Sequence, residues 1–418
     1  MATTQRVGQG MRIQTAVLHA GVDVDATSPA STIPPIFQTS AFPQESAGQL
    51  EAIFDNTAPG FCYTRVGNPT VTAFERRMAA VEGGRAAIAC ASGMAAVFNV
   101  LAGVASAGDE VVATRALYGG TLELFGDLGR LGITVVPVEE VTPESLAQVV
   151  TERTRLVFAE TISNPRLDVL DVPAAAAACH ELGLPLCVDN TSASPYLCRP
   201  LEQGADLVVE STSKYVNGGG NAISGVIVDA GRFRWDPARY PGLAAFRKYG
   251  PLALSASLRA GLWRDTGACL APMNAFLNCV GLETLAVRME RACDNALALA
   301  EWLAASGLVD EVGYPGLPTS RCLELAGRVL GGRYGALLTF RAGSRERAFA
   351  FVDRVRLAYR ASNIGDVKTL VLHPASTIFL EESVEERAAA GVFDDTIRVS
   401  VGIEDVRDLI EDFEQALS

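Results

Sequence analysis

The stretch that decides the fold is Leu207-Val208-Val209-Glu210-Ser211-Thr212-Ser213-Lys214-Tyr215, because an apolar run typical of a buried strand ends there in three hydroxyl residues and a lysine. A glycine triplet follows at 218–220. Ligands of open α/β sheets bind beyond the carboxyl ends of strands, so Lys214 is a candidate nucleophile that can condense with an aldehyde. The hydroxyls of Ser211 and Ser213 suit phosphate oxygens. A solvated lysine at a strand end is the alternative interpretation.

Composition indicates a soluble globular protein with a sizeable core, because 49% of the 418 residues are hydrophobic. A net charge of −13 argues against binding to nucleic acid or to an anionic membrane. The nine cysteines show no CxxC pair and no Cys/His metal spacing, which favours a reduced cytoplasmic location and no metal site. Residues 1–12 lack the apolar region of a signal peptide. Residues 86–108 are uncharged but weakly apolar, and we expect a buried strand, turn and helix there.

Helical and strand patterns alternate after residue 70, as in a largely parallel sheet covered by helices. Residues 1–70 are rich in proline and aperiodic, which predicts an extended arm. A large domain is expected at 71–271. A smaller C-terminal α/β domain is expected at 272–418, beginning with a long amphipathic helix. Expected strands are 86–89, 110–114, 133–137, 156–160, 185–189, 207–209 and 225–229 in the large domain, and 336–341, 369–372 and 397–401 in the small one.

Three motifs at predicted strand ends can contact a small ligand. Ser92-Gly93-Met94 opens a helix whose free backbone N–H groups suit an anion, although a simple N-cap gives the same pattern. Tyr118 begins another helix, where its ring can cover a flat ligand or pack in the core. Asn164 offers an amide after the strand at 156–160, and a turn is the alternative there.

Two charged residues belong to apolar strands, where an unpaired charge is costly. Asp189 closes one strand and can pair with a cationic ring nitrogen, or cap a helix. Arg398 lies within another and matches a substrate carboxylate, assisted by Asn363, unless it forms a structural salt bridge. In the arm, Tyr63 and Arg65 share one face of an extended segment.

Together these residues meet the needs of pyridoxal 5′-phosphate, which requires a lysine for its aldehyde, an acid at its ring nitrogen, an aromatic cover and phosphate donors. The motifs at 63–70, 92–96, 117–121, 189–191, 211–215, 373–376 and 398–402 resemble those of the Cys/Met metabolism family of pyridoxal-phosphate enzymes. That family includes cystathionine γ-synthase, methionine γ-lyase and O-acetylhomoserine sulfhydrylase.

The resemblance implies the α/β fold of type I aminotransferases, with a mostly parallel seven-stranded sheet, and a homotetramer of two active dimers. It implies that Lys214 and Tyr118 are catalytic. It implies cofactor contacts from Lys214, Asp189, Tyr118, Ser92, Gly93, Met94, Asn164, Ser211 and Ser213, with Tyr63 and Arg65 reaching the phosphate of the neighbouring subunit. It also implies that the substrate carboxylate is bound by Arg398, Asn363 and Asn164.

Segments 274–277, 281–285 and 363–370 most resemble the O-acetylhomoserine sulfhydrylases. The expected reaction is γ-replacement on O-acetylhomoserine, or a related O-acylhomoserine, by sulfide or a thiol. Glu210, Gly219 and Phe379 stand where relatives tend to carry histidine, which favours γ-elimination of a thiol, acyloxy or halide group as the alternative. A nucleotide-binding oxidoreductase and an inactive scaffold are rival classes. No G-x-G-x-x-G follows the first strand, and a complete set of cofactor residues argues against a scaffold.

Overall fold

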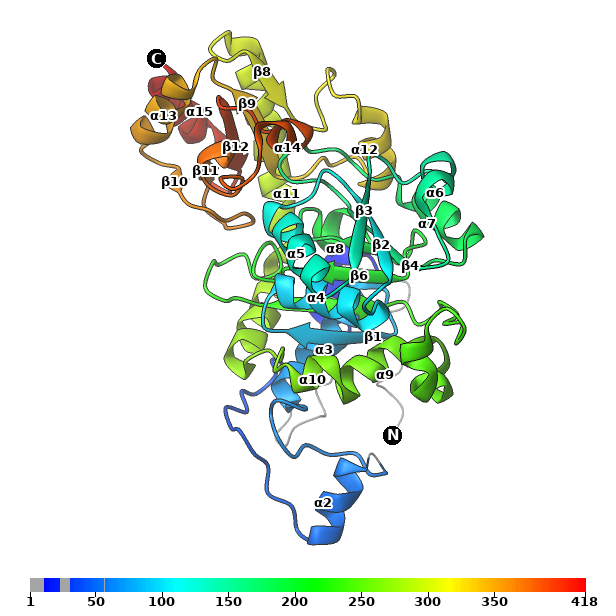
Figure 1. Ribbon diagram of the computed structural model, residues 1–418. Helices are drawn as coiled ribbons and strands as arrows, with labels where there is room; N and C mark the ends of the chain where they lie inside the picture. Colours follow the sequence, from blue (N-terminus) through cyan, green and yellow to red (C-terminus); the bar gives the residue numbers. More distant parts are fainter. Residues whose placement is uncertain (1–10, 23–30, 56) are drawn as a thin grey trace.

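The computed structural model describes residues 11–22, 31–55 and 57–418. Within the predicted arm, α1 (Ile13–His19) packs on the body through Ala16 and Val17, whereas α2 (Ala47–Phe54) projects away from it (Figure 1). Residues 1–10, 23–30 and 56 of the predicted arm, which include most of the segment considered for a signal peptide, lie outside the described residues.

A seven-stranded sheet with the order β1-β7-β6-β5-β4-β2-β3 forms the centre of the molecule. β7 runs antiparallel to both of its neighbours, and the other adjacent pairs are parallel, which confirms the predicted mostly parallel α/β sheet. The strands are β1 (Ala86–Cys90), β2 (Glu110–Thr114), β3 (Thr134–Val138), β4 (Thr154–Glu160), β5 (Leu186–Asp189), β6 (Leu207–Glu210) and β7 (Gly225–Asp229).

Helices cover both faces of this sheet, and each face has its own hydrophobic core. One face carries α1, α3 (Pro69–Glu82), α6 (Pro143–Val149), α7 (Val172–Glu181) and α8 (Ser194–Leu197). The other carries α4 (Gly93–Val104), α5 (Gly119–Arg130), η1 (Pro241–Leu252), α9 (Ala253–Ala260) and α10 (Leu262–Asp265). Strands buried on both faces are nearly all apolar, which explains why they were recognisable in the sequence.

Local signals set the helix ends that matter for the site. α3 begins at Pro69 because the side chain of Asn68 accepts a hydrogen bond from the backbone of Thr70, and it ends at Gly83 in the left-handed conformation (φ 78°). α4 follows β1 directly, so residues 86–104 are a buried strand, a turn and a helix, as predicted. Among the described residues, no helix is long and apolar enough to cross a membrane.

A 35-residue helix, α11 (Pro272–Ser306), leads from the large sheet to a second sheet with the order β10-β11-β12-β9-β8 (Figure 1). Two of its five strands, β8 and β10, are only three and two residues long and were not predicted. The elements are β8 (Glu311–Gly313), α12 (Leu323–Val329), β9 (Leu337–Arg341), α13 (Arg345–Arg354), β10 (Tyr359–Arg360), β11 (Leu370–Leu372), η2 (Pro374–Ser376), α14 (Val384–Ala389), β12 (Thr396–Ser400) and α15 (Val406–Leu417).

Candidate active site

A cavity of about 220 Å³ lies at the carboxyl ends of the large-sheet strands, where segments of the second sheet face them. Such edges are where α/β sheets bind ligands. The cavity brings together all but two of the predicted site residues: Ser92, Gly93, Met94, Tyr118, Asn164, Asp189, Ser211, Ser213, Lys214, Asn363 and Arg398. These positions span more than 300 residues of sequence, so their convergence supports one shared site.

Lys214 is largely enclosed rather than solvated. Its Nζ donates a hydrogen bond of 2.6 Å to Oδ1 of Asn363. Burial, together with the positive charge of Arg398, lowers the pKa of Lys214 to about 8. A substantial neutral fraction is therefore present near physiological pH, as attack on an aldehyde requires.

Arg398 is 3% exposed and has no carboxylate partner among the described residues, so the alternative of a structural salt bridge is wrong. One Nη donates to Oδ1 of Asn164 at 3.2 Å and the other to the backbone oxygen of Asn363 at 3.1 Å. Its Nε is buried and has no hydrogen-bond partner among the described residues. Burial lowers the pKa of Arg398 to about 10. A buried guanidinium with unused donor capacity favours binding of an incoming anion.

Asp189 ends β5 at the cavity wall, where its Oδ1 accepts a hydrogen bond of 2.9 Å from the backbone N–H of Thr191. Burial raises the pKa of Asp189. Its register partner on β4 is the buried Glu160, so two acids lie side by side at this edge. Negative charge on this pair would stabilise a cationic group in the cavity.

Gly93 begins α4 opposite Ser211, and a Cβ added there would lie only 2.6 Å from the Ser211 Cβ. Glycine is therefore required for this close approach, which exposes the helix N-terminus to the cavity. Ser92 caps α4, its Oγ accepting from the backbone of Ala95 at 3.0 Å. The N-cap interpretation is thus confirmed, in a position that also lines the cavity.

Ser213 has a more constrained hydroxyl than its neighbour Ser211. Its Oγ donates to the backbone oxygen of Ser224 at 3.0 Å and accepts from the Ser224 N–H at 2.8 Å. The hydroxyl therefore fixes the loop after β6 in addition to lining the cavity.

Tyr118 lines the cavity and is 38% exposed, so the alternative of core packing is wrong. Its backbone N–H donates to Oε1 of Glu160 at 2.7 Å, and the Asn164 N–H donates to Oε2 of the same carboxylate at 3.1 Å. Glu160 thus orients two site residues at once. Sequence reasoning missed it, although it closes an apolar strand just as Asp189 does.

Other cavity residues that the sequence did not reveal include the apolar side chains of Ile223 and Ile378. Both belong to loops whose positions depend on the tertiary structure, so no local pattern could identify them. Three positions were singled out because relatives tend to carry histidine there. Phe379 is buried and lies near Gly119, Gly219 is exposed, and Glu210 is buried at the end of β6.

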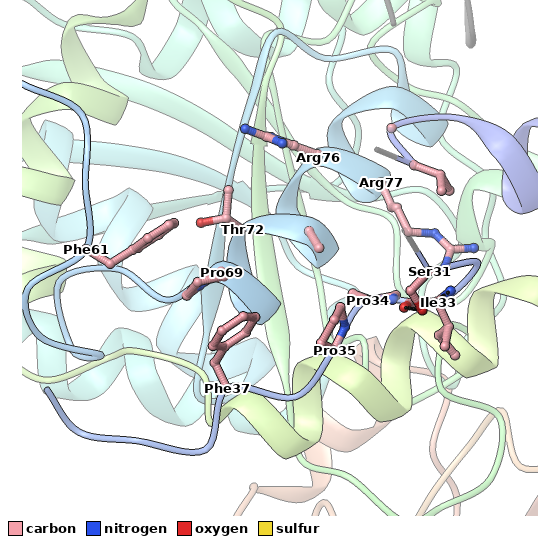
Figure 2. Close-up of a pocket in the computed structure, with 13 residues that line it drawn as sticks. Ser31, Ile33, Pro34, Pro35, Phe37, Phe61, Pro69, Thr72, Arg76 and Arg77 are labelled. Atoms are coloured by element: carbon pink, nitrogen blue, oxygen red, sulfur yellow. Dashed lines mark hydrogen bonds between the residues drawn. The ribbon is translucent and has the colours of Figure 1, made fainter. Parts of the chain in front are cut away.

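Tyr63 and Arg65 do not line this cavity. The Arg65 guanidinium lies 5.6 Å from the Tyr63 ring centroid and donates to the backbone oxygen of Arg264 at 2.8 Å. A separate cavity of about 310 Å³ lies between the arm and α3, with Phe37 and Phe61 in its wall (Figure 2). That cavity contains none of the predicted site residues and marks where the arm crosses α3.

The residues of the main cavity fit pyridoxal phosphate. The lysine amine, with its lowered pKa, suits the aldehyde of the cofactor, and Asp189, which has no ion-pair partner among the described residues, suits the ring nitrogen. The accessible ring of Tyr118 suits the ring face, and the glycine at the N-terminus of α4 suits the phosphate. The unused guanidinium nitrogen of Arg398 leaves room for the carboxylate of an amino acid.

Comparison with known proteins points the same way. Residues 14–418 match the family described as Cys/Met metabolism PLP-dependent enzyme. The chain is 42% identical to homocysteine synthase of Schizosaccharomyces pombe, covering 97% of each chain. It is 41% identical to O-acetyl-L-homoserine sulfhydrylase 1 of Thermus thermophilus, covering 98% of this chain and all of the relative.

A solved structure of a putative O-acetylhomoserine (thiol)-lyase from Campylobacter jejuni, which carries a pyridoxyl-lysine phosphate, superposes with a TM-score of 0.92 at 35% identity, covering 97% of this chain and all of that one. The solved structure of cystathionine γ-lyase of Lactobacillus plantarum superposes with a TM-score of 0.85 at 30% identity, covering 97% of this chain and 98% of that one. On its cavity, its fold and its full-length similarity, the chain belongs to the Cys/Met metabolism family of pyridoxal-phosphate-dependent enzymes.

Proposed function

We propose that the enzyme catalyses γ-replacement on O-acetylhomoserine, with sulfide entering and acetate leaving. The observation that carries this proposal is the pairing of Lys214 and Arg398 in one cavity of a chain that is 41–42% identical, end to end, to proteins named homocysteine synthase and O-acetyl-L-homoserine sulfhydrylase. In the overall change, the Cγ–O bond breaks, a Cγ–S bond forms, and the products are homocysteine and acetate.

In this proposal, Arg398 binds the substrate and Lys214 transfers protons. Pyridoxal phosphate, when bound, supplies an electron sink for negative charge at the substrate Cα. Arg398 binds the substrate carboxylate, with Asn363 and Asn164 holding the guanidinium in place. The Lys214 amine carries the cofactor and moves protons at Cα and Cβ, for which a pKa of about 8 is well matched.

The remaining cavity residues hold the cofactor in this proposal. Tyr118 covers its ring and assists catalysis, and Asp189 keeps the ring nitrogen protonated. The phosphate contacts are assigned to Ser92, Gly93, Met94, Ser211 and Ser213, and Asn164 touches the cofactor as well as supporting Arg398. These assignments agree with the lining of the cavity and with the helix N-terminus at Gly93.

The proposal extends to the assembly. Residues 1–70 form an arm, 71–271 the cofactor-binding domain and 272–418 the small domain. The enzyme is a cytoplasmic homotetramer of two dimers, in which Tyr63 and Arg65 complete the site of the neighbouring subunit. Exposed apolar side chains along the arm support this, since Ile36, Phe37 and Phe54 are 37–63% exposed.

The test is to incubate the holoenzyme with O-acetylhomoserine, with and without sulfide, and to measure homocysteine, acetate and 2-oxo acid. Homocysteine that appears only with sulfide supports γ-replacement. A 2-oxo acid released at the same rate without sulfide would instead establish γ-elimination, the alternative suggested by Glu210, Gly219 and Phe379. An O-acylhomoserine or thiol panel then defines the preferred substrates.

A further inference from the structure

The long helix α11 lies directly against the turn that carries Lys214. This turn, residues 211–218, is called the Lys214 turn below. Gly281 of α11 lies so close to it that an added Cβ would be 2.4 Å from the backbone oxygens of both Val216 and Asn217. Only glycine allows such an approach, so the backbones of the helix and the turn are in contact.

Arg288, two helical turns farther along α11, binds the same turn through hydrogen bonds. Its Nη1 donates to the backbone oxygen of Tyr215 at 2.6 Å, and its Nη2 donates to that of Val216 at 3.2 Å and to that of Gly281 at 2.7 Å. Arg288 is buried and forms no ion pair among the described residues, so backbone carbonyl groups stabilise its charge. These bonds fix the backbone immediately after Lys214.

Asn295, a further two helical turns along α11, binds the other half of the site. Its Nδ2 donates to the backbone oxygens of Gly402 at 3.0 Å and Glu404 at 2.8 Å, just beyond β12, the strand that contains Arg398. Asn295 is buried as well. Because it lies seven residues after Arg288, the two side chains share one face of the helix, about 10 Å apart along its axis.

These contacts join Lys214 and Arg398 through one stiff element. Lys214 follows a strand of the large sheet, Arg398 belongs to the second sheet, and α11 runs between the two sheets (Figure 1). The loop at 363–367 also reaches the Lys214 turn, where the Val367 N–H donates to the Gly218 oxygen at 2.9 Å. A continuous 35-residue helix is the stiffer connection, because its backbone is hydrogen-bonded from turn to turn.

We propose that Arg288 and Asn295 are positioning residues, through which α11 sets the distance between the two ends of the substrate site. An amino acid places its amine at the cofactor carried by Lys214 and its carboxylate at Arg398, so it binds both ends only when their separation matches it. A displacement of about 1 Å can cost about 100-fold in such an arrangement. The inference rests on the proposed roles of Lys214 and Arg398 and is independent of the reaction at Cγ.

The test compares three ligands that differ in which end of the site they use. Homoserine has both the amine and the carboxylate, 3-amino-1-propanol lacks the carboxylate, and 4-hydroxybutanoate lacks the amine. The Kd of each for the holoenzyme is measured by calorimetry. Asn295→Leu keeps the side-chain volume and removes the donor, and Arg288→Lys keeps the charge but cannot make the same hydrogen bonds. Arg291→Lys, at an exposed position of the same helix, is the matched control.

We expect Asn295→Leu to weaken homoserine binding by about tenfold to 100-fold and to leave each of the other two ligands within about twofold of wild type. The reason is that Asn295 contacts neither end of the ligand, so only the separation of the ends changes. Arg288→Lys should give the same pattern, and Arg291→Lys should change none of the three affinities. Equal losses for all three ligands, or unchanged homoserine binding, would overturn the proposal.

The same measurements separate this inference from the proposed function. A wild-type enzyme that binds homoserine no better than 3-amino-1-propanol would refute the carboxylate role of Arg398, and this inference with it. A wild-type preference for homoserine that both variants retain would refute the positioning role alone. Because Asn295 and Arg288 make separate contacts, either variant is sufficient for the test if the other does not fold.

Discussion

Replacing Arg398 with lysine tests the best-defined contact of the proposed site. The guanidinium is buried, is held from two sides by Asn164 and by the Asn363 backbone, and has an Nε without a protein partner. Lysine keeps the positive charge but cannot make two parallel hydrogen bonds to a carboxylate, and its ammonium cannot use the same two acceptors in the same geometry.

The size of the effect follows from the burial. Truncating one partner of a buried, hydrogen-bonded charge pair costs about 2–5 kcal/mol. At 1.36 kcal/mol per factor of ten, affinity for a substrate carboxylate should fall by about 30-fold to 5,000-fold. The pKa of Lys214, which Arg398 helps to lower, should change little, because the positive charge is retained.

The assay is binding of homoserine to the holoenzyme, followed by its visible spectrum, beside 3-amino-1-propanol, the same molecule without its carboxylate. Arg398→Lys should weaken homoserine binding by the stated factor and leave the amino alcohol unchanged. Arg341→Lys, on the neighbouring strand and ion-paired with Asp395 at 2.8 Å, is the matched control and should change neither. Equal losses for both ligands in Arg398→Lys would refute the carboxylate role.

Three further outcomes are expected. Gly93→Ala places a Cβ 2.6 Å from the opposite side chain and should weaken pyridoxal phosphate binding measured by equilibrium dialysis, whereas Gly126→Ala, with nothing within 4 Å, should not. Asn363→Asp puts a carboxylate near the Lys214 amine, which should raise the pKa of Lys214 above about 8 by about 1–3 units. Capture of the cofactor by the apoenzyme, followed by absorbance, should then require a correspondingly higher pH. An unchanged pH dependence of capture would contradict this prediction. Co-expressed Arg65→Ala and Lys214→Ala subunits, each inactive alone, should regain activity in hybrids if the arm completes the neighbouring site; inactive hybrids argue against sharing.

Ten of the twelve strands in the described part of the chain were predicted to within two residues at each end, because each contains an apolar run that can be recognised without its neighbours in the sheet. Lys214 and Asp189 were recognisable for the same reason, since a polar residue at the end of such a run stands out. The short strands β8 and β10 were not predicted, because neither contains a buried apolar run, whereas the equally short β11 is an apolar and fully buried Leu-Val-Leu segment. A long helix at the start of the small domain was predicted from its amphipathic pattern, and α11 begins there at Pro272.

The sequence by itself determined the fold class and the family, and it identified the candidate site residues, because apolar periodicity and closely spaced motifs are local properties of the chain. Only the tertiary structure decided how those residues act on one another. The role of Glu160, which accepts hydrogen bonds from the backbone of both Tyr118 and Asn164, depends on a contact between residues 42 positions apart. Hydrogen bonding and burial depend on where the backbone places each group in space, and that placement is not encoded in any single stretch.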